Sequence, residues 1–339
     1  MLLATLALIS VTFTDSKERA KAFAVYGALS GGGAAIGLVL GGALTEFASW
    51  RWTLWINVPI AFLAIALAIP FVRESRTEAR TGYDVPGAVT VTLGLLAIIF
   101  GITRAESEGW TGTSTLVFLG LGLVLLAIFV VIESRSPHPL LPLRILANRN
   151  RGGAYLASFF IGVGLFAIFL FLSYFFQGVL GYSPLESGLL FLPLTAGIIV
   201  SAGITSRLLP IIGPRFITGG GFALTIVGLL LLQRMSENST YIGDILPSMI
   251  LVGLGIGFVF VPLSATALFG VGDADAGVAS AVLNAAQQVG GSVGVAFLNT
   301  IATSATTAYI VVSDDLSLIH ISEPTRPLYI SYAVFGLKK

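Results

Sequence analysis

Charged residues are almost absent from a series of long apolar runs, and this pattern constrains the fold more than any other feature of the chain. Between Ala20 and Thr307 the sequence repeatedly runs through Leu, Ile, Val, Phe, Ala and Gly, and the charges gather in the short gaps. Each run has about 18 to 25 residues, enough to cross the hydrocarbon core of a bilayer as an α-helix. Transmembrane strands are shorter and alternate in polarity. The runs therefore predict membrane-spanning helices.

The runs predict an all-α polytopic membrane protein with nine complete transmembrane helices and one fragment, the short apolar stretch Met1–Phe13. Only helices and closed barrels satisfy every backbone hydrogen bond in lipid, and these runs are too continuous for barrel strands. The nine complete windows cover residues 23–45, 52–72, 86–103, 114–132, 152–176, 186–206, 214–233, 245–269 and 277–303.

Lys and Arg residues are divided unequally between alternate gaps. One set of gaps holds twelve of them, from Lys17 to Arg215, whereas the other set holds only Arg51, Arg104 and Arg234. Because cytoplasmic loops carry the excess of Lys and Arg, the richer gaps are predicted to be cytoplasmic. The segment Met1–Phe13 then runs towards the cytoplasm. A chain that starts with half a helix on the outer face is expected to lack N-terminal helices.

The composition excludes several classes of function. Only 10% of the residues are charged and the mean hydropathy is +0.94, whereas soluble domains carry nearer 25% charge. There is no cysteine, and the histidines His138 and His320 lie in a loop and in the tail, so we expect no metal and no cofactor. The net charge of +1 says nothing about nucleic acid, but the sequence has no basic patch with interleaved aromatics, so we expect no nucleic-acid partner. The windows lack the cluster of His, Asp, Glu or Cys that an intramembrane enzyme needs, so we expect no enzymatic activity.

Small residues and turn motifs form a specific pattern in the second and third apolar segments. Gly33, Gly37 and Gly41 share one helix face, followed by Gly42, and such spacing lets a neighbouring backbone approach closely. Further pieces are Ser49–Trp52, Ile56–Pro59, Asp84–Gly87, Tyr174–Gln177, Gly181–Pro184, Gly188–Pro193, Asp275–Gly277, Ser280, Asn284 and Gln287–Gly291. With these pieces the chain resembles the major facilitator superfamily, specifically its branch of fourteen-helix drug:proton antiporters.

The resemblance implies a partial major facilitator fold. Residues 1–72 correspond to a remnant of the N-terminal bundle (the end of helix 4 and helices 5 and 6), and residues 73–151 to a linker with two extra helices. Residues 152–313 correspond to a C-terminal bundle that lacks its last helix. Residues 314–339 resemble a translated sequencing-adapter read-through, so we expect this tail not to be native. The glycines from Gly33 to Gly42 resemble the antiporter motif of the fifth helix, although Leu38 stands where the family usually has proline.

Aromatic residues of the window 152–176 are the candidates for a substrate cavity, because the resemblance places this window among the helices that line it. Aromatic faces suit lipophilic and cationic molecules. Each candidate has the alternative of facing lipid or packing against a neighbouring helix. The candidates are Tyr155, Phe159, Phe166 and Tyr174.

A row of polar residues follows one side of the window 277–303. It consists of Ser280, Asn284, Gln287 or Gln288, and Gly291. Two roles remain open for this row: it lines the cavity, or it joins two helices through hydrogen bonds, and we prefer the second. Asn57 and Gln177 lie near the outer ends of their spans and are predicted gate or interface residues.

The resemblance implies export of lipophilic or cationic small molecules (multidrug efflux) by proton antiport, in the cytoplasmic (inner) membrane of a bacterium. No Asp, Glu, Lys or Arg lies in the middle of a window, so the proton-coupling residue is expected in missing N-terminal helices and the chain alone is expected to be inactive. The expected partners are the lipid bilayer, the substrate and protons; the sequence identifies no partner protein. Two alternatives remain: a metabolite transporter of another branch, and a non-transporting membrane scaffold.

Overall fold

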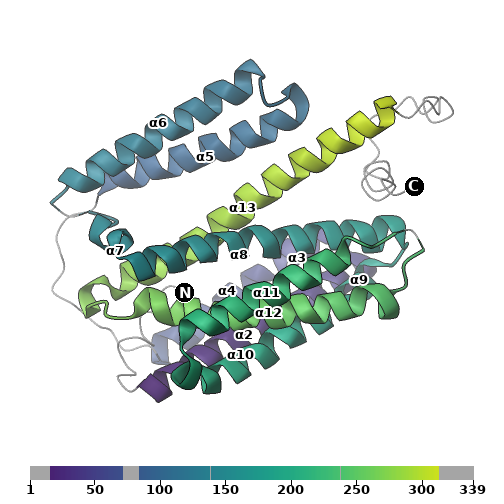
Figure 1. The fold of residues 1–339 in the computed structure, drawn as a ribbon, viewed down its shortest axis with the longest axis horizontal. Helices are drawn as coiled ribbons and strands as arrows, with labels where there is room; N and C mark the ends of the chain where they lie inside the picture. The colour runs from purple at the N-terminus through teal and green to yellow at the C-terminus, as the bar shows by residue number, and fades with distance from the viewer. Residues whose placement is uncertain (1–15, 72–83, 138, 237, 313–339) are drawn as a thin grey trace.

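The computed structural model describes residues 16–71, 84–137, 139–236 and 238–312, and in these ranges every regular element is a helix (Figure 1). Eight helical segments are long and apolar enough to cross a membrane, and each matches one expected window. The ninth window, 23–45, lies within α2 (Ser16–Phe47), where Ala35–Phe47 forms a shorter apolar segment. The prediction of an all-α polytopic fold is confirmed. The stretch Met1–Phe13 and the tail 314–339 lie outside the described residues.

The elements follow the chain in the order that the apolar runs predict. After α2 they are α3 (Trp50–Trp55), α4 (Asn57–Phe71), α5 (Val85–Glu108), α6 (Thr113–Arg135), α7 (Leu143–Ala147), α8 (Arg149–Tyr174), a π-helical turn η1 (Phe175–Val179), α9 (Pro184–Leu190), α10 (Leu192–Ile212), α11 (Pro214–Leu232), a second π-helical turn η2 (Tyr241–Ile245), α12 (Leu246–Leu268) and α13 (Asp273–Val312).

Polar side chains in the gaps fix where several helices begin. Asp84 caps α5 by accepting a hydrogen bond from the backbone N–H of Gly87 (2.8 Å). Asn148 caps α8 in the same way through the N–H groups of Asn150 and Arg151. Ser183 and the glutamate three residues later form a reciprocal capping box at the start of α9. These caps satisfy N–H groups that the first helical turn leaves without partners.

The helices pack into a bundle with α12 at its centre. Helices α10 and α11 pack against α12, and α8 packs against α13. Helix α2 joins the bundle through α9, α10 and α12, while α5 and α6 form an antiparallel pair that packs on the bundle chiefly through the contact of α5 with α13 (Figure 1). Two apolar clusters fill the interior: one around Tyr155 and Val259, and one around Phe176 and Met249.

Contacts between distant segments agree with the predicted alternation of chain direction. The side chain of Arg144 pairs with that of Asp275 at 2.8 Å, and both lie in gaps predicted to be cytoplasmic. At the other end of the molecule, the carboxylate of Glu46 accepts a hydrogen bond from the backbone N–H of Leu185 at 3.0 Å, joining two gaps predicted to be external. The orientation of the whole chain in the membrane stays a prediction.

Candidate functional site

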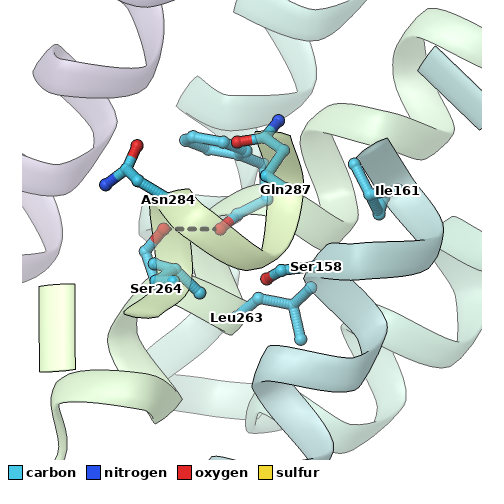
Figure 2. Close-up of a pocket in the computed structure, with 8 residues that line it drawn as sticks. Ser158, Ile161, Leu263, Ser264, Asn284 and Gln287 are labelled. Atoms are coloured by element: carbon cyan, nitrogen blue, oxygen red, sulfur yellow. Dashed lines mark hydrogen bonds between the residues drawn. The ribbon is translucent and has the colours of Figure 1, made fainter. Parts of the chain in front are cut away.

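A small polar cavity lies between α8, α12 and α13, where most neighbouring side chains are apolar (Figure 2). Its polar groups are the hydroxyls of Ser158 and Ser264 and the side-chain amides of Asn284 and Gln287. Only 7% of Ser158 is exposed. Its apolar walls are Ile161, Phe260, Leu263 and Leu283. The cavity has room for about one water molecule, which these groups would hydrogen-bond.

The polar lining of this cavity keeps spare hydrogen-bonding capacity. Ser264 donates to the carbonyl of Phe260 at 3.0 Å, as the dashed line in Figure 2 shows, and the Asn284 amide donates to the carbonyl of Ser280 at 3.1 Å. A carboxamide has two donor hydrogens and an acceptor oxygen, so one such bond leaves further groups for a ligand or a water molecule. The cavity therefore suits a neutral polar group rather than a full charge.

The residues of the predicted polar row of α13 do not all lie in the same environment. Asn284 and Gln287 line the cavity, whereas Gln288 is exposed on another side of the helix. Ser280 is fully buried and donates to the carbonyl of Gly277 at 2.8 Å. Gly291 packs beneath the ring of Phe166. The roles proposed for Asn284 and Gln288 stay predictions, but only Asn284 lies on this cavity.

The glycine face of α2 forms the second candidate surface, where α2 crosses α9. A Cβ atom added to Gly42 would lie 2.5 Å from the carbonyl oxygen of Pro184, and one added to Gly188 would lie 2.6 Å from the carbonyl oxygen of Leu38. Real Cβ contacts essentially never fall below 3.0 Å. The two backbones therefore approach closely because both positions are glycine.

A cavity of about 260 Å³ lies beside this crossing. Three of the predicted motif glycines, Gly37, Gly41 and Gly42, line it, and so does the predicted gate residue Gln177. Gly33 does not line this cavity. A Cβ atom added at Gly33, Gly37 or Gly41 would have no described atom within 4 Å, so Gly42 alone of the four motif glycines lies at the close crossing. The remaining lining residues are Leu38, Thr45, Thr53, Ser173, Pro184, Ser187, Gly188 and Phe191.

The structure does not bring the four aromatic candidates of α8 together. Tyr155 is 4% exposed and lies in the apolar core, where its hydroxyl has no hydrogen-bond partner among the described residues. Phe159 packs edge-to-face on Phe160, with ring centroids 5.6 Å apart. Phe166 and Tyr174 line a different groove, between α5, α8 and α13. Their roles in substrate binding stay predictions.

Asn57 lies at the start of α4 and does not line the cavity that Gln177 borders. Its amide donates to the carbonyls of Thr53 (3.0 Å) and Leu54 (3.2 Å), which ties the end of α3 to α4. It also borders a shallow apolar groove with Val58, Ala61, Phe62 and Ile65. Its predicted role as a gate or interface residue is not decided by these contacts.

Sequence reasoning missed three residues of the polar cavity or left them undecided: Ser158, Ser264 and Gln287. Ser158 is the only hydroxyl residue between Tyr155 and Ser173, and this isolated polar group in an apolar run was the available signal. In the described part of the chain, no three His, Cys, Asp or Glu residues are grouped so as to hold a metal ion.

Residues 1–295 match the family model described as Major Facilitator Superfamily. The chain is 46% identical over 310 residues to the puromycin resistance protein pur8 of Streptomyces alboniger, covering 91% of this chain and 61% of that protein. It is 34% identical to the cephamycin export protein CmcT of Amycolatopsis lactamdurans, over 88% of this chain and 62% of that protein. It is also 34% identical to the uncharacterized transporter EfpA of Mycobacterium tuberculosis, over 89% of this chain and 57% of that protein. The chain thus spans about three fifths of the length of these relatives.

Proposed function

The chain belongs to the Major Facilitator Superfamily, and on that premise we propose that it takes part in exporting lipophilic or cationic small molecules by proton antiport across a bacterial cytoplasmic membrane. Its relatives include proteins named for puromycin resistance and cephamycin export. The superfamily consists of transporters, and the chain is a multi-pass membrane protein. Three statements go beyond family membership and are our proposal: the class of substrate, the use of protons, and the membrane in which the protein lies.

The close crossing of α2 and α9 is the observation that carries this proposal. Transport by alternating access needs groups of helices that move against each other around a site within the membrane. At this crossing, Gly42 and Gly188 leave only backbone between two segments far apart in the sequence, and a cavity of about 260 Å³ lies beside them. A contact between two backbones can slide or part without repacking large side chains, which suits a moving interface.

The polar cavity of α8, α12 and α13 supplies a site for selecting a substrate. An uncharged cavity of hydroxyls and carboxamides recognises hydroxyl, amide or amine groups of an organic molecule through hydrogen bonds, while the apolar walls contact its carbon skeleton. Because the cavity has room for only about one water molecule, the outer parts of a ligand would need the adjoining helices to move apart.

A chimeric transporter tests this proposal. We replace the matching 310-residue segment of the S. alboniger puromycin resistance protein with that of this chain, and express the chimera in a bacterium that lacks its own efflux pumps. We expect the chimera to lower accumulation of puromycin or ethidium, and a protonophore to abolish this effect. Normal membrane expression without any change in accumulation would favour a scaffold and contradict the proposal. Increased uptake would indicate another transporter class.

Gln287→Leu and Gln288→Leu form a matched pair in the same chimera. The first removes a hydrogen-bonding group from the polar cavity, whereas the second changes an exposed neighbour on the same helix. We expect Gln287→Leu to reduce efflux about tenfold, as the loss of one hydrogen bond to a substrate typically does, and Gln288→Leu to leave it nearly unchanged. Equal effects of the two substitutions on efflux would argue against a role for this cavity.

A further inference from the structure

A lateral groove between α5, α8 and α13 has the size and lining of a ligand site. Its volume is about 470 Å³, within the usual range of small-molecule pockets. It is separate from the two cavities described above, because none of its lining residues is shared with them. The lining consists of Ile99, Thr103, Glu106, Phe166, Leu170, Tyr174, Gly291, Ser292, Val295, Ala296 and Asn299.

The only charged side chain in the lining of this groove is Glu106, near the end of α5. One of its carboxylate oxygens accepts a hydrogen bond from the amide of Asn299 (3.2 Å), and the other accepts one from the hydroxyl of Thr303 (3.3 Å). Both donors are neutral, and the described residues give Glu106 no ion pair. The groove therefore carries one uncompensated negative charge.

The nearest basic residue in the sequence, Arg104, does not neutralise that charge. Its guanidinium pairs with the carboxylate of Glu108 at 3.7 Å and lies over the ring of Phe100 at 5.1 Å. Residues two apart on a helix point to nearly opposite sides, so Arg104 faces away from the groove. Neither Arg104 nor Glu108 belongs to its lining.

Two aromatic side chains give the groove faces that suit a flat or bulky organic cation. Phe166 is 40% exposed and Tyr174 is 45% exposed, and both line the groove. Gly291 makes room for the first ring, because a Cβ atom there would lie 2.5 Å from the Cδ2 atom of Phe166. Aromatic faces attract cations through their quadrupole, and this attraction grows when the site excludes water.

Holding α5 against α13 does not by itself require a charged residue at this position. The hydroxyl of Thr300 donates to the backbone carbonyl of Ile102 at 3.2 Å, and the rings of Trp110 and Phe297 pack edge-to-face with centroids 5.6 Å apart. A neutral glutamine could accept from Asn299 as well. Glu106 is exposed just beyond the window 86–103, and only neutral groups contact its carboxylate, so this charge remains available to a cationic ligand.

The groove is also continuous with a surface that faces the bilayer. Ile99 and Thr103 line both this groove and a larger apolar groove of about 720 Å³ on the α5–α6 pair. The other lining residues of that groove are Leu93, Leu96, Ala97, Phe100, Phe118, Leu121 and Leu125. A lipophilic molecule dissolved in the membrane therefore has an apolar path to the carboxylate.

We propose that this groove is a second binding site, which takes a lipophilic organic monocation with its charge beside Glu106 and its apolar groups against Phe166 and Tyr174. The site is formed jointly by the inserted α5–α6 pair and by the bundle helices α8 and α13. It gives the inserted pair a function in ligand binding that does not depend on whether the chain transports the ligand.

Equilibrium binding of tetraphenylphosphonium to the full chain in lipid nanodiscs tests the site. We expect Glu106→Gln to weaken binding about tenfold, and Glu108→Gln to change it by less than about twofold, because only Glu106 faces the groove. Binding of triphenylphosphine oxide, a neutral aromatic probe, is expected to stay the same in both variants. The melting temperature of each variant shows whether it is folded.

A third variant keeps the test decisive if Glu106→Gln does not fold. Tyr174→Leu removes one aromatic face but keeps an apolar side chain at this position and the charge of Glu106, and it is expected to weaken tetraphenylphosphonium binding several-fold. Undiminished binding of the cation in a folded Glu106→Gln variant, or equal losses in Glu106→Gln and Glu108→Gln, would overturn the proposal. Failure of the chimera to export drugs would leave this binding result unaffected, so the two proposals fail separately.

Discussion

Gly162→Val is expected to prevent stable packing of α8 against α13. A Cβ atom at Gly162 would collide with the backbone carbonyl oxygen of Gln287, and one at Gly290 would collide with that of Phe159. Both carbonyl groups belong to helix backbone, which cannot avoid the added atom by changing rotamer as a side chain can. Overpacking of this kind costs about 3 kcal/mol, a large share of the stability of a typical domain. We expect loss of the monodisperse folded protein in detergent and a melting temperature lowered by many degrees.

Gly164→Val is the matched control for this prediction. It makes the same chemical change on the same helix, but no described atom lies within 4 Å of a Cβ atom at Gly164. The difference in helix propensity between Gly and Val is therefore common to both variants and cancels. If Gly164→Val lowered the melting temperature as much as Gly162→Val does, the close approach of α8 and α13 would not be what stabilises the pair.

Gly42→Leu is expected to separate α2 from α9. Its side chain would have to displace the backbone carbonyl of Pro184 and the Cα atom of Leu185, which lie 2.5 and 2.8 Å from the added Cβ atom. Overpacking here costs about 1 to 3 kcal/mol, which lowers the equilibrium constant for docking about fivefold to a hundredfold. The rest of the bundle is expected to stay folded, because α8, α10, α11, α12 and α13 pack on one another.

Cysteine cross-linking measures this separation, since the chain contains no native cysteine. The carboxylate of Glu46 contacts the backbone of Leu185, so Glu46→Cys with Leu185→Cys places two thiols at the crossing. A short bis-maleimide is expected to join them rapidly, and about tenfold more slowly when Gly42→Leu is added. Gly33→Ala, which adds a Cβ atom into open space, should leave the rate unchanged. Rapid cross-linking in the Gly42→Leu background would contradict the predicted separation.

The helices could be predicted from sequence because spanning a membrane depends on the length and composition of a run. All nine complete windows fall on helices in the described part of the chain. The helix ends were less predictable. Helix α8 starts at Arg149 rather than 152 because the Asn148 side chain caps it, and α13 already begins at Asp273, four residues before the expected 277. Caps and tertiary contacts extend a helix into polar sequence, which hydropathy does not detect.

The candidate site was less predictable because it depends on how each helix is rotated about its axis. Gln287 and Gln288 are chemically identical neighbours, yet only Gln287 faces the polar cavity. Tyr155 and Phe166 belong to one aromatic run, but Tyr155 is buried in the core and Phe166 borders the lateral groove. The sequence allows several possible neighbours for each side chain of α8. The way in which α12 and α13 pack against α8 determines which of these neighbours it contacts. The spacing of residues in the sequence shows which side chains share one face of a helix, but it does not show which other helix packs against that face.

Helix α13 contributes walls to both the polar cavity and the lateral groove. Leu283, Asn284 and Gln287 line the first, and residues from Gly291 to Asn299 on the next turns line the second. A twist of this one helix about its long axis would alter the shape of both spaces together. A ligand that favoured one rotation of α13 would therefore change the affinity of the other space, and thermodynamic linkage would make this effect equal in both directions.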